Sequence, residues 1–178
     1  MTATALARQT GSWQQEVYAL LRKNGVTQFA YVPDGGHKAL IDMALADNAA
    51  HAVSLTTEAE GIGVLAGADL GGTRGVMLIQ SSGVGNCINQ LSLTSLGRFP
   101  LLMLVTMRGD FGEANPWQFP MGQASERVLN AMGVATVRID DPDKVVTMVE
   151  YAIAQAFKGQ QPTAVLLTQL LLGPKAFE

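Results

Sequence analysis

The segment from Ser81 to Asn89 reads Ser-Ser-Gly-Val-Gly-Asn-Cys-Ile-Asn and is the strongest candidate for a small-molecule site in the chain. It directly follows the apolar run 75–80 and precedes a helix-like stretch. A strand that ends at small hydroxyl residues and glycines leaves free backbone N–H groups at the start of the next helix. Such groups hold anionic or polar ligands. We therefore expect a ligand at this junction of strand and helix.

Two carboxylates, Glu58 and Glu60, lie at the start of a second helix-like stretch, just after a short predicted strand. At least one of them is expected at the ligand-bearing edge of the sheet, where a carboxylate accepts hydrogen bonds. Acidic residues are also favoured in the first turn of any helix, because they offset the positive end of its dipole. Position alone therefore leaves a functional and a structural interpretation open.

The histidines and the single cysteine are the remaining candidates for chemistry. His37 follows the turn Pro33-Asp-Gly-Gly36 and is expected to face the same edge, where a histidine can have a functional role. A surface histidine at a helix start is the alternative. His51 is interpreted as structural, and Cys87 as a small packing residue, because no base is evident beside it to activate a nucleophile.

Helices and strands that alternate along the chain must position these residues. The apolar and capping patterns predict helices at 12–24, 37–47, 57–71, 86–97, 122–132 and 142–158. Strands are predicted at 28–32, 52–56, 75–80, 101–106, 135–139 and 163–168. The alternation indicates a doubly wound α/β fold, with a mostly parallel six-stranded sheet and helices on both faces. Ligands of such sheets bind beyond the carboxyl ends of the strands, here at 33–38, 81–86 and 106–121.

Length and composition exclude several classes of function. The 178 residues suffice for one domain with a full core. A net charge of −3 without a Lys/Arg cluster argues against nucleic acid or an anionic membrane as partner. Charged residues make up only 15%, so we expect a partner to cover part of the surface. One cysteine, no signal-peptide pattern and no apolar run of about 18 residues favour a cytoplasmic protein without a membrane span.

The stretch from Gly61 to Ala66 matches the residue pattern of the dinucleotide-binding fingerprint but not its expected structural context. That motif belongs in a strand-to-helix turn, followed by a strand that ends in an acidic residue. Here the glycines lie inside the predicted helix 57–71, and the next strand ends in Gln80. We interpret Gly61 and Gly63 as small residues that permit close helix packing.

Three separated motifs occur in the chain order Thr57–Gly71, Gln80–Leu93 and Pro100–Gly109. Together they resemble the pyrimidine-binding domain of thiamine diphosphate enzymes. The similarity runs over almost the whole chain and is nearest to the alpha subunit of sulfopyruvate decarboxylase and the N-terminal half of phosphonopyruvate decarboxylase. In this family a glutamate opens a helix whose ninth following residue is glycine. Glu58 and Gly67 match that spacing, so Glu58 rather than Glu60 would have the family's role.

The resemblance implies thiamine diphosphate as cofactor and Glu58 as the carboxylate that binds N1′ of its pyrimidine. That bond stabilises the imino form with which the cofactor deprotonates its own C2, before it attacks a 2-oxo acid and CO₂ leaves. By resemblance, the cofactor or substrate would also be near Gln80, Ser81, Ser82, Gly83 and Asn86. The substrate side would be formed by Asp34, Gly35, Gly36, His37 and Arg108, and His37 would be the catalytic candidate for substrate contact or proton transfer. Arg108 could pair with an anionic group or instead serve a structural role in the 106–121 segment.

Two features depart from the family pattern. The chain has no Gly-Asp-Gly motif with a later asparagine, the family's signature for Mg²⁺ and the diphosphate. The resemblance therefore implies one pyrimidine-binding domain over 1–178, no metal ligands in this chain, and a separate beta subunit that holds Mg²⁺ in a heterotetramer or larger assembly. The loop 33–38 also differs from the Pro-Cys-Ser or Pro-Asp-Ser of those enzymes, so the identity of the 2-oxo acid stays open.

The predicted function is thus the alpha subunit of a heteromeric, thiamine diphosphate-dependent 2-oxo-acid decarboxylase. Three alternatives remain: a subunit of a carboligating lyase or synthase with the same cofactor, a non-catalytic regulatory or scaffold subunit, and a free-standing nucleotide-binding flavodoxin-like domain. Glu58 counts against the scaffold, because a scaffold needs no carboxylate aimed at a cofactor.

Overall fold

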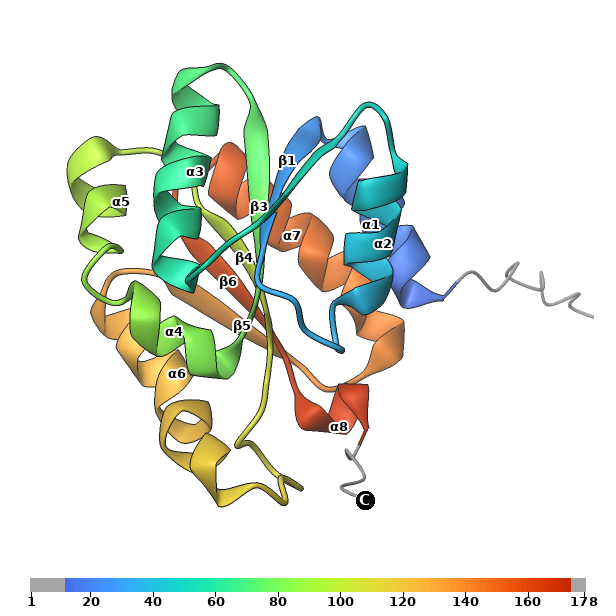
Figure 1. Cartoon of the computed structure of the whole chain (residues 1–178), viewed down its shortest axis with the longest axis vertical. Helices are drawn as coiled ribbons and strands as arrows, with labels where there is room; N and C mark the ends of the chain where they lie inside the picture. The colour runs from blue at the N-terminus through green and yellow to red at the C-terminus, as the bar shows by residue number, and fades with distance from the viewer. Residues whose placement is uncertain (1–11, 174–178) are drawn as a thin grey trace, which may run out of the picture.

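A computed structural model describes residues 12–173 of the chain. It shows a parallel sheet with helices on both faces (Figure 1). Its strands are β1 (Val26–Tyr31), β2 (His51–Ser54), β3 (Arg74–Gln80), β4 (Leu102–Thr106), β5 (Ala135–Ile139) and β6 (Thr163–Leu167). Its α-helices are α1 (Trp13–Lys23), α2 (Lys38–Ala46), α3 (Glu58–Leu70), α4 (Ser81–Cys87), α5 (Ser92–Gly97), α6 (Phe119–Ala131), α7 (Val145–Phe157) and α8 (Gln169–Leu172). Short 3₁₀ helices, η1 (Pro116–Gln118) and η2 (Pro142–Lys144), precede α6 and α7. Both ends of the predicted domain 1–178 lie outside the described residues.

The six strands lie in the order β2-β1-β3-β4-β6-β5, and every neighbouring pair is parallel. The predicted α/β class and parallel sheet are therefore confirmed. Strand β4 is buried at every position, as its continuous apolar sequence predicts for a central strand. From β1 the chain first adds β2 on one side and then β3 on the other, so the strand order reverses between β1 and β3. In open parallel sheets, ligands bind at such a reversal, beyond the carboxyl ends of the strands.

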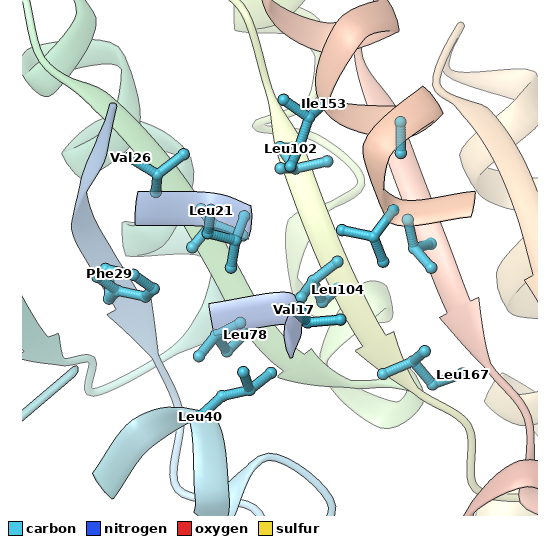
Figure 2. Packing of buried hydrophobic residues seen from close by; sticks show 14 of the residues in the cluster. Val17, Leu21, Val26, Phe29, Leu40, Leu78, Leu102, Leu104, Ile153 and Leu167 are labelled. Carbon is cyan, nitrogen blue, oxygen red and sulfur yellow. The ribbon is translucent and has the colours of Figure 1, made fainter. Parts of the chain in front are cut away.

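Alternating side chains of the strands build two apolar layers. Leu78, Leu102 and Leu104 point to the face that α1, α2 and α7 cover, where they pack with Val17 and Ile153 (Figure 2). The residues next to them in sequence, including Met77 and Met103, point to the opposite face, which α3, α4 and α6 cover. Because both faces of the central strands are buried, only the ends of the strands offer polar groups to a ligand.

The helix boundaries differ from the predicted ones mainly after β3. The predicted loop 81–86 is helical, and the helix predicted at 86–97 is interrupted, since the chain forms α4 and α5 with turns at 88–91 between them. The helix predicted at 122–132 begins earlier, at Phe119, and α8 was not predicted. The longest α-helices have 13 residues. None of the helices within residues 12–173 combines the length and apolarity that crossing a bilayer requires.

The glycine pattern of α3 has a partly structural explanation. A Cβ atom at Gly61 would lie 2.9 Å from side-chain atoms of both Leu55 and Met77, so this glycine permits close packing of the helix on the sheet. The same explanation fails for Gly63, where an added Cβ would meet no atom within 4 Å.

Candidate functional site

Polar side chains gather where β1, β2 and β3 end, at the lower end of the sheet in Figure 1. Asp34 follows β1, Glu58 opens α3 after β2, and Ser81 opens α4 directly after β3. The reversal of strand order places the ends of β1 and β3 side by side. The sheet thus brings together residues that lie far apart in the sequence.

Glu58 is held against α4 and is nearly buried. Its side chain is 9% exposed, and its Oε2 accepts a hydrogen bond of 2.7 Å from Nδ2 of Asn86. The carboxyl group lies directly over Gly83, where an added Cβ would be 2.3 Å from the Cδ and Oε1 atoms of Glu58. Within residues 12–173, Oε1 accepts no hydrogen bond. A nearly buried carboxylate with one unused acceptor can bind the N–H group of a ligand.

Glu60, the other acidic residue of this helix turn, points elsewhere. Its Oε2 accepts a hydrogen bond of 2.9 Å from the backbone N–H of Thr56, and the residue is exposed. This contact satisfies a backbone donor in front of the helix, as an acidic side chain in the first turn commonly does. The two carboxylates therefore differ in role: Glu60 caps the helix and Glu58 faces α4.

Asp34 joins the ends of three strands in one hydrogen-bond network. Its Oδ1 accepts from Nε2 of Gln80 at 3.0 Å, and its Oδ2 accepts from Oγ1 of Thr106 at 2.8 Å and from the N–H of Gly36 at 2.9 Å. Gln80 in turn accepts from Oγ of Ser82 at 2.8 Å. Burial opposes the charge of Asp34, but the bonds from Thr106 and Gln80 outweigh it and hold the pKa of the carboxyl below its usual value. Asp34 therefore stays ionised at neutral pH.

The prediction that His37 faces the open edge is wrong. Its ring is fully buried, and Nε2 lies 3.1 Å from the carbonyl oxygen of Ile79 and 2.9 Å from that of Leu104. Carbonyl oxygens only accept, so Nε2 carries the proton, and burial lowers the pKa of the ring below its usual value. Through these hydrogen bonds the histidine holds the loop between β1 and α2 against β3 and β4. Its Nδ1 has no partner within the described residues.

Arg108 forms a buried ion pair rather than an open anion site. Its Nε and one terminal nitrogen donate to the two oxygens of Glu113 at 2.5 and 2.9 Å, and the Glu113 side chain is 1% exposed. The bonds from Arg108 hold the pKa of Glu113 far below its usual value. Gln169, which the sequence did not indicate, donates to the same carboxylate at 3.1 Å. Of the two roles expected for Arg108, these contacts match the structural one within the 106–121 segment.

Ser81 is used by the fold. Its hydroxyl is fully buried, donates to the backbone oxygen of Arg108 at 2.8 Å and accepts from the backbone N–H of Arg108 at 2.9 Å. These bonds tie the start of α4 to the segment after β4. The hydroxyl of Ser81 is thus occupied by the fold, and its place near a cofactor stays a prediction, whereas Ser82 and Asn86 are exposed at the edge.

A pocket of about 210 Å³ opens beside the Asp34 network. Its lining includes four of the predicted substrate residues, Asp34, Gly35, Gly36 and Arg108, together with Gln169. Glu58 is not among the residues that line this pocket, and its hydrogen bond goes to Asn86 of α4. The edge therefore has two polar groups, one around Glu58 and one around Asp34.

Two further predictions concern Cys87 and metal ions. Cys87 is fully buried, and burial together with the charge of Glu58 raises the pKa of its thiol to about 12, so the interpretation as a packing residue is confirmed. Among residues 12–173 there is no group of three or more His, Cys, Asp or Glu side chains that could hold a metal ion.

Comparison with known proteins gives relatives over nearly the whole chain. The alpha subunit of sulfopyruvate decarboxylase from Methanococcus maripaludis is 32% identical over 157 residues, which are 88% of this chain and 94% of that protein. A sulfopyruvate decarboxylase from Methanosarcina acetivorans is 31% identical over 166 residues, 93% of this chain but 41% of that longer protein. No protein-family profile matches.

Among solved structures, a 2-oxoglutarate:ferredoxin oxidoreductase from Magnetococcus marinus has the same fold. It superposes with a TM-score of 0.68 at 14% sequence identity, over 91% of this chain and 29% of that chain. At this identity the likeness concerns the fold alone.

Proposed function

Because the chain belongs to the family of sulfopyruvate decarboxylase alpha subunits, we propose that it is the pyrimidine-binding subunit of a thiamine diphosphate-dependent 2-oxo-acid decarboxylase. The observation that carries the proposal is the position of Glu58. It is the one acidic side chain of the α3 start that turns toward α4, and its Oε1 is left open among the described residues.

Glu58 fits the pyrimidine ring of the cofactor in both charge and burial. A carboxylate only accepts hydrogen bonds, and a protonated N1′ of an aminopyrimidine donates one. Such a charge-assisted bond is strong where water is excluded, and Glu58 is 9% exposed before any partner covers the edge. Gly83 leaves the space beside the carboxylate free of a side chain. When bound, the cofactor supplies the group that takes up the electron pair released as CO₂ departs.

The pocket beside Asp34 is proposed to take the 2-oxo acid. Asp34 is held in one orientation by Gln80, Thr106 and the N–H of Gly36, so its position is set before a ligand arrives. Arg108 keeps its place through Glu113 and lines the same pocket. In this proposal the chain's own residues orient the acid. His37 holds the loop between β1 and α2, which carries Asp34, against β3 and β4.

The rest of the cofactor site is proposed to lie on a beta subunit that binds Mg²⁺ and the diphosphate. The M. maripaludis relative, which this chain covers over 94% of its length, is named as an alpha subunit, while the M. acetivorans relative is covered over only 41%. A second domain of that longer protein would correspond to the separate subunit here. The low charge content, 15% of residues, is consistent with an edge that a partner covers.

The test is the release of CO₂ by the chain co-expressed with its partner subunit, assayed with pyruvate, sulfopyruvate, phosphonopyruvate and an aryl 2-oxo acid. Glu58→Gln keeps the shape of the side chain but removes its charge, and we expect it to reduce turnover at least about 100-fold. Glu60→Gln is the matched control on the same helix turn and should keep the parent rate. Thermal unfolding of all the complexes should be nearly the same.

Parent-like turnover of the Glu58→Gln complex would exclude Glu58 as the residue that activates the cofactor. A parent complex that releases no CO₂ from any acid of the panel would favour a non-catalytic subunit. Adding an aldehyde to the assay distinguishes decarboxylation from carboligation by the product.

A further inference from the structure

The contacts of Asn86 differ from those expected of a residue that binds cofactor directly. Its side-chain amide is turned to the Glu58 carboxylate, with Nδ2 2.7 Å from Oε2. We propose that Asn86 is a positioning residue: it holds Oε2 of Glu58 so that Oε1 is presented to the pyrimidine of the cofactor. This inference rests on the proposed function and names the group that sets the geometry of the activating carboxylate.

The position of Glu58 is set from two sides by α4. Gly83 lies beneath the carboxyl group, and a Cβ there would come within 2.3 Å of both Cδ and Oε1. Asn86 lies one helical turn further on and reaches the other oxygen. Residues three apart on a helix share a face, so α4 supplies both the surface on which the carboxylate packs and the hydrogen bond that orients it.

Without this hydrogen bond the orientation of the carboxylate would not be fixed, because a glutamate side chain has three rotatable bonds and its carboxyl group can turn. One hydrogen bond to Oε2 fixes which oxygen remains available. Within residues 12–173, Asn86 is the only side chain that donates to Glu58. A substitution that removes the Asn86 amide therefore keeps the charge of Glu58 but leaves the orientation of its carboxylate unfixed.

Two ligands separate orientation from general binding. The first is thiamine diphosphate, and the second is its 1′-deaza analogue, in which a C–H group replaces N1′ and cannot bond to Glu58. Affinities of both are measured by calorimetry for the complex of this chain with its partner subunit. The ratio of the two dissociation constants reports only the contact between N1′ and the carboxylate.

We expect the parent complex to bind thiamine diphosphate about tenfold or more tightly than the analogue, as a charge-assisted hydrogen bond allows. Asn86→Ala should reduce this preference about tenfold or abolish it, while the affinity for the analogue stays unchanged. Asn86→Asp, which keeps the shape but places a second carboxylate beside Glu58, should do the same. Asn48→Ala, which changes an exposed asparagine between α2 and β2, is the control and should keep the parent ratio.

A double-mutant cycle completes the test. If Asn86 acts only through Glu58, adding Asn86→Ala to Glu58→Gln changes the preference no further. A parent preference that survives in Asn86→Ala overturns the inference and leaves the proposed function standing. Equal weakening of both ligands also overturns it, because that result indicates a structural role. A parent complex that binds the two ligands equally overturns the proposed function, and the inference with it.

Discussion

Replacement of Gly83 by alanine should separate folding from activity. Gly83 lies within α4 and has a helical backbone, so the alanine favours the helix by about 0.5–1 kcal/mol. The new Cβ would stand 2.3 Å from Cδ and Oε1 of Glu58, and ordinary carbon contacts begin at about 3.5 Å. The carboxyl group must therefore move by roughly 1 Å, which a flexible side chain can do at a cost of about 0.5–1.5 kcal/mol.

These opposing contributions leave the stability of Gly83→Ala within about 1 kcal/mol of the parent. Turnover should nevertheless fall about 100-fold, because a displacement of 1 Å in a catalytic constellation has an effect of that size. Steady-state CO₂ release and thermal unfolding of the assembled complex provide the two measurements. Gly63→Ala is the matched control, since its added Cβ meets nothing within 4 Å and should raise stability without changing turnover. A Gly83→Ala complex with parent turnover would refute the reasoning.

Two further predictions concern buried charges and stability. Burial lowers the pKa of folded His37, so the unfolded chain takes up its proton first as the pH falls below about 6.5, and stability should decline by up to about 1.4 kcal/mol per pH unit. Urea denaturation at pH 7 and pH 5 measures this decline, which His37→Gln should reduce; an unchanged slope would contradict the assignment. Glu113→Gln should destabilise the chain by about 3–5 kcal/mol, because it leaves Arg108 paired with a neutral group in a buried place. The difference should disappear in acid, well below pH 4.5, where Glu113 of the parent becomes protonated; a small difference at pH 7 would show that the pair contributes little.

The sequence was informative where one physical pattern dominated. Strand β4 is apolar at each position because it is covered on both faces, and its place in the centre of the sheet followed from that. The alternation of strands and helices predicted the parallel sheet, and the rule for carboxyl ends selected the segments that carry Asp34 and Ser82. Boundaries were accurate where a single cap sets them, as Ser12 does before α1.

The features that the sequence did not show come from contacts that join distant segments. Ser81 and His37 have types that occur in sites, yet both are buried by partners far away in sequence, the backbone of Arg108 and the carbonyl oxygens of Ile79 and Leu104. The glycines of α4 suggested a loop, but they instead let the helix pass close to other side chains, Gly83 to Glu58 and Gly85 to Met121. Gln169 gave no signal at all, since its function as a donor to Glu113 depends on the fold of the 106–121 segment.

The separation of Glu58 from Glu60 illustrates the same limit. Both lie in the first turn of α3, and local helix physics treats them alike. Their contacts distinguish them: Glu58 meets Asn86 and Gly83 of another helix, and Glu60 accepts from the N–H of Thr56. Resemblance to a family identified the residue, and the contacts supply a physical reason for the choice.

The order of the strands also determines how synthesis of the chain can proceed. β6 pairs with both β4 and β5, and it is the last strand to be made. A nascent chain that stops before Thr163 therefore has an apolar β4 with one open edge and a β5 with no neighbour to pair with. Unpaired apolar edges are where chains associate with one another. Growing polypeptides should thus be most prone to aggregation in the interval between translation of β4 and of β6.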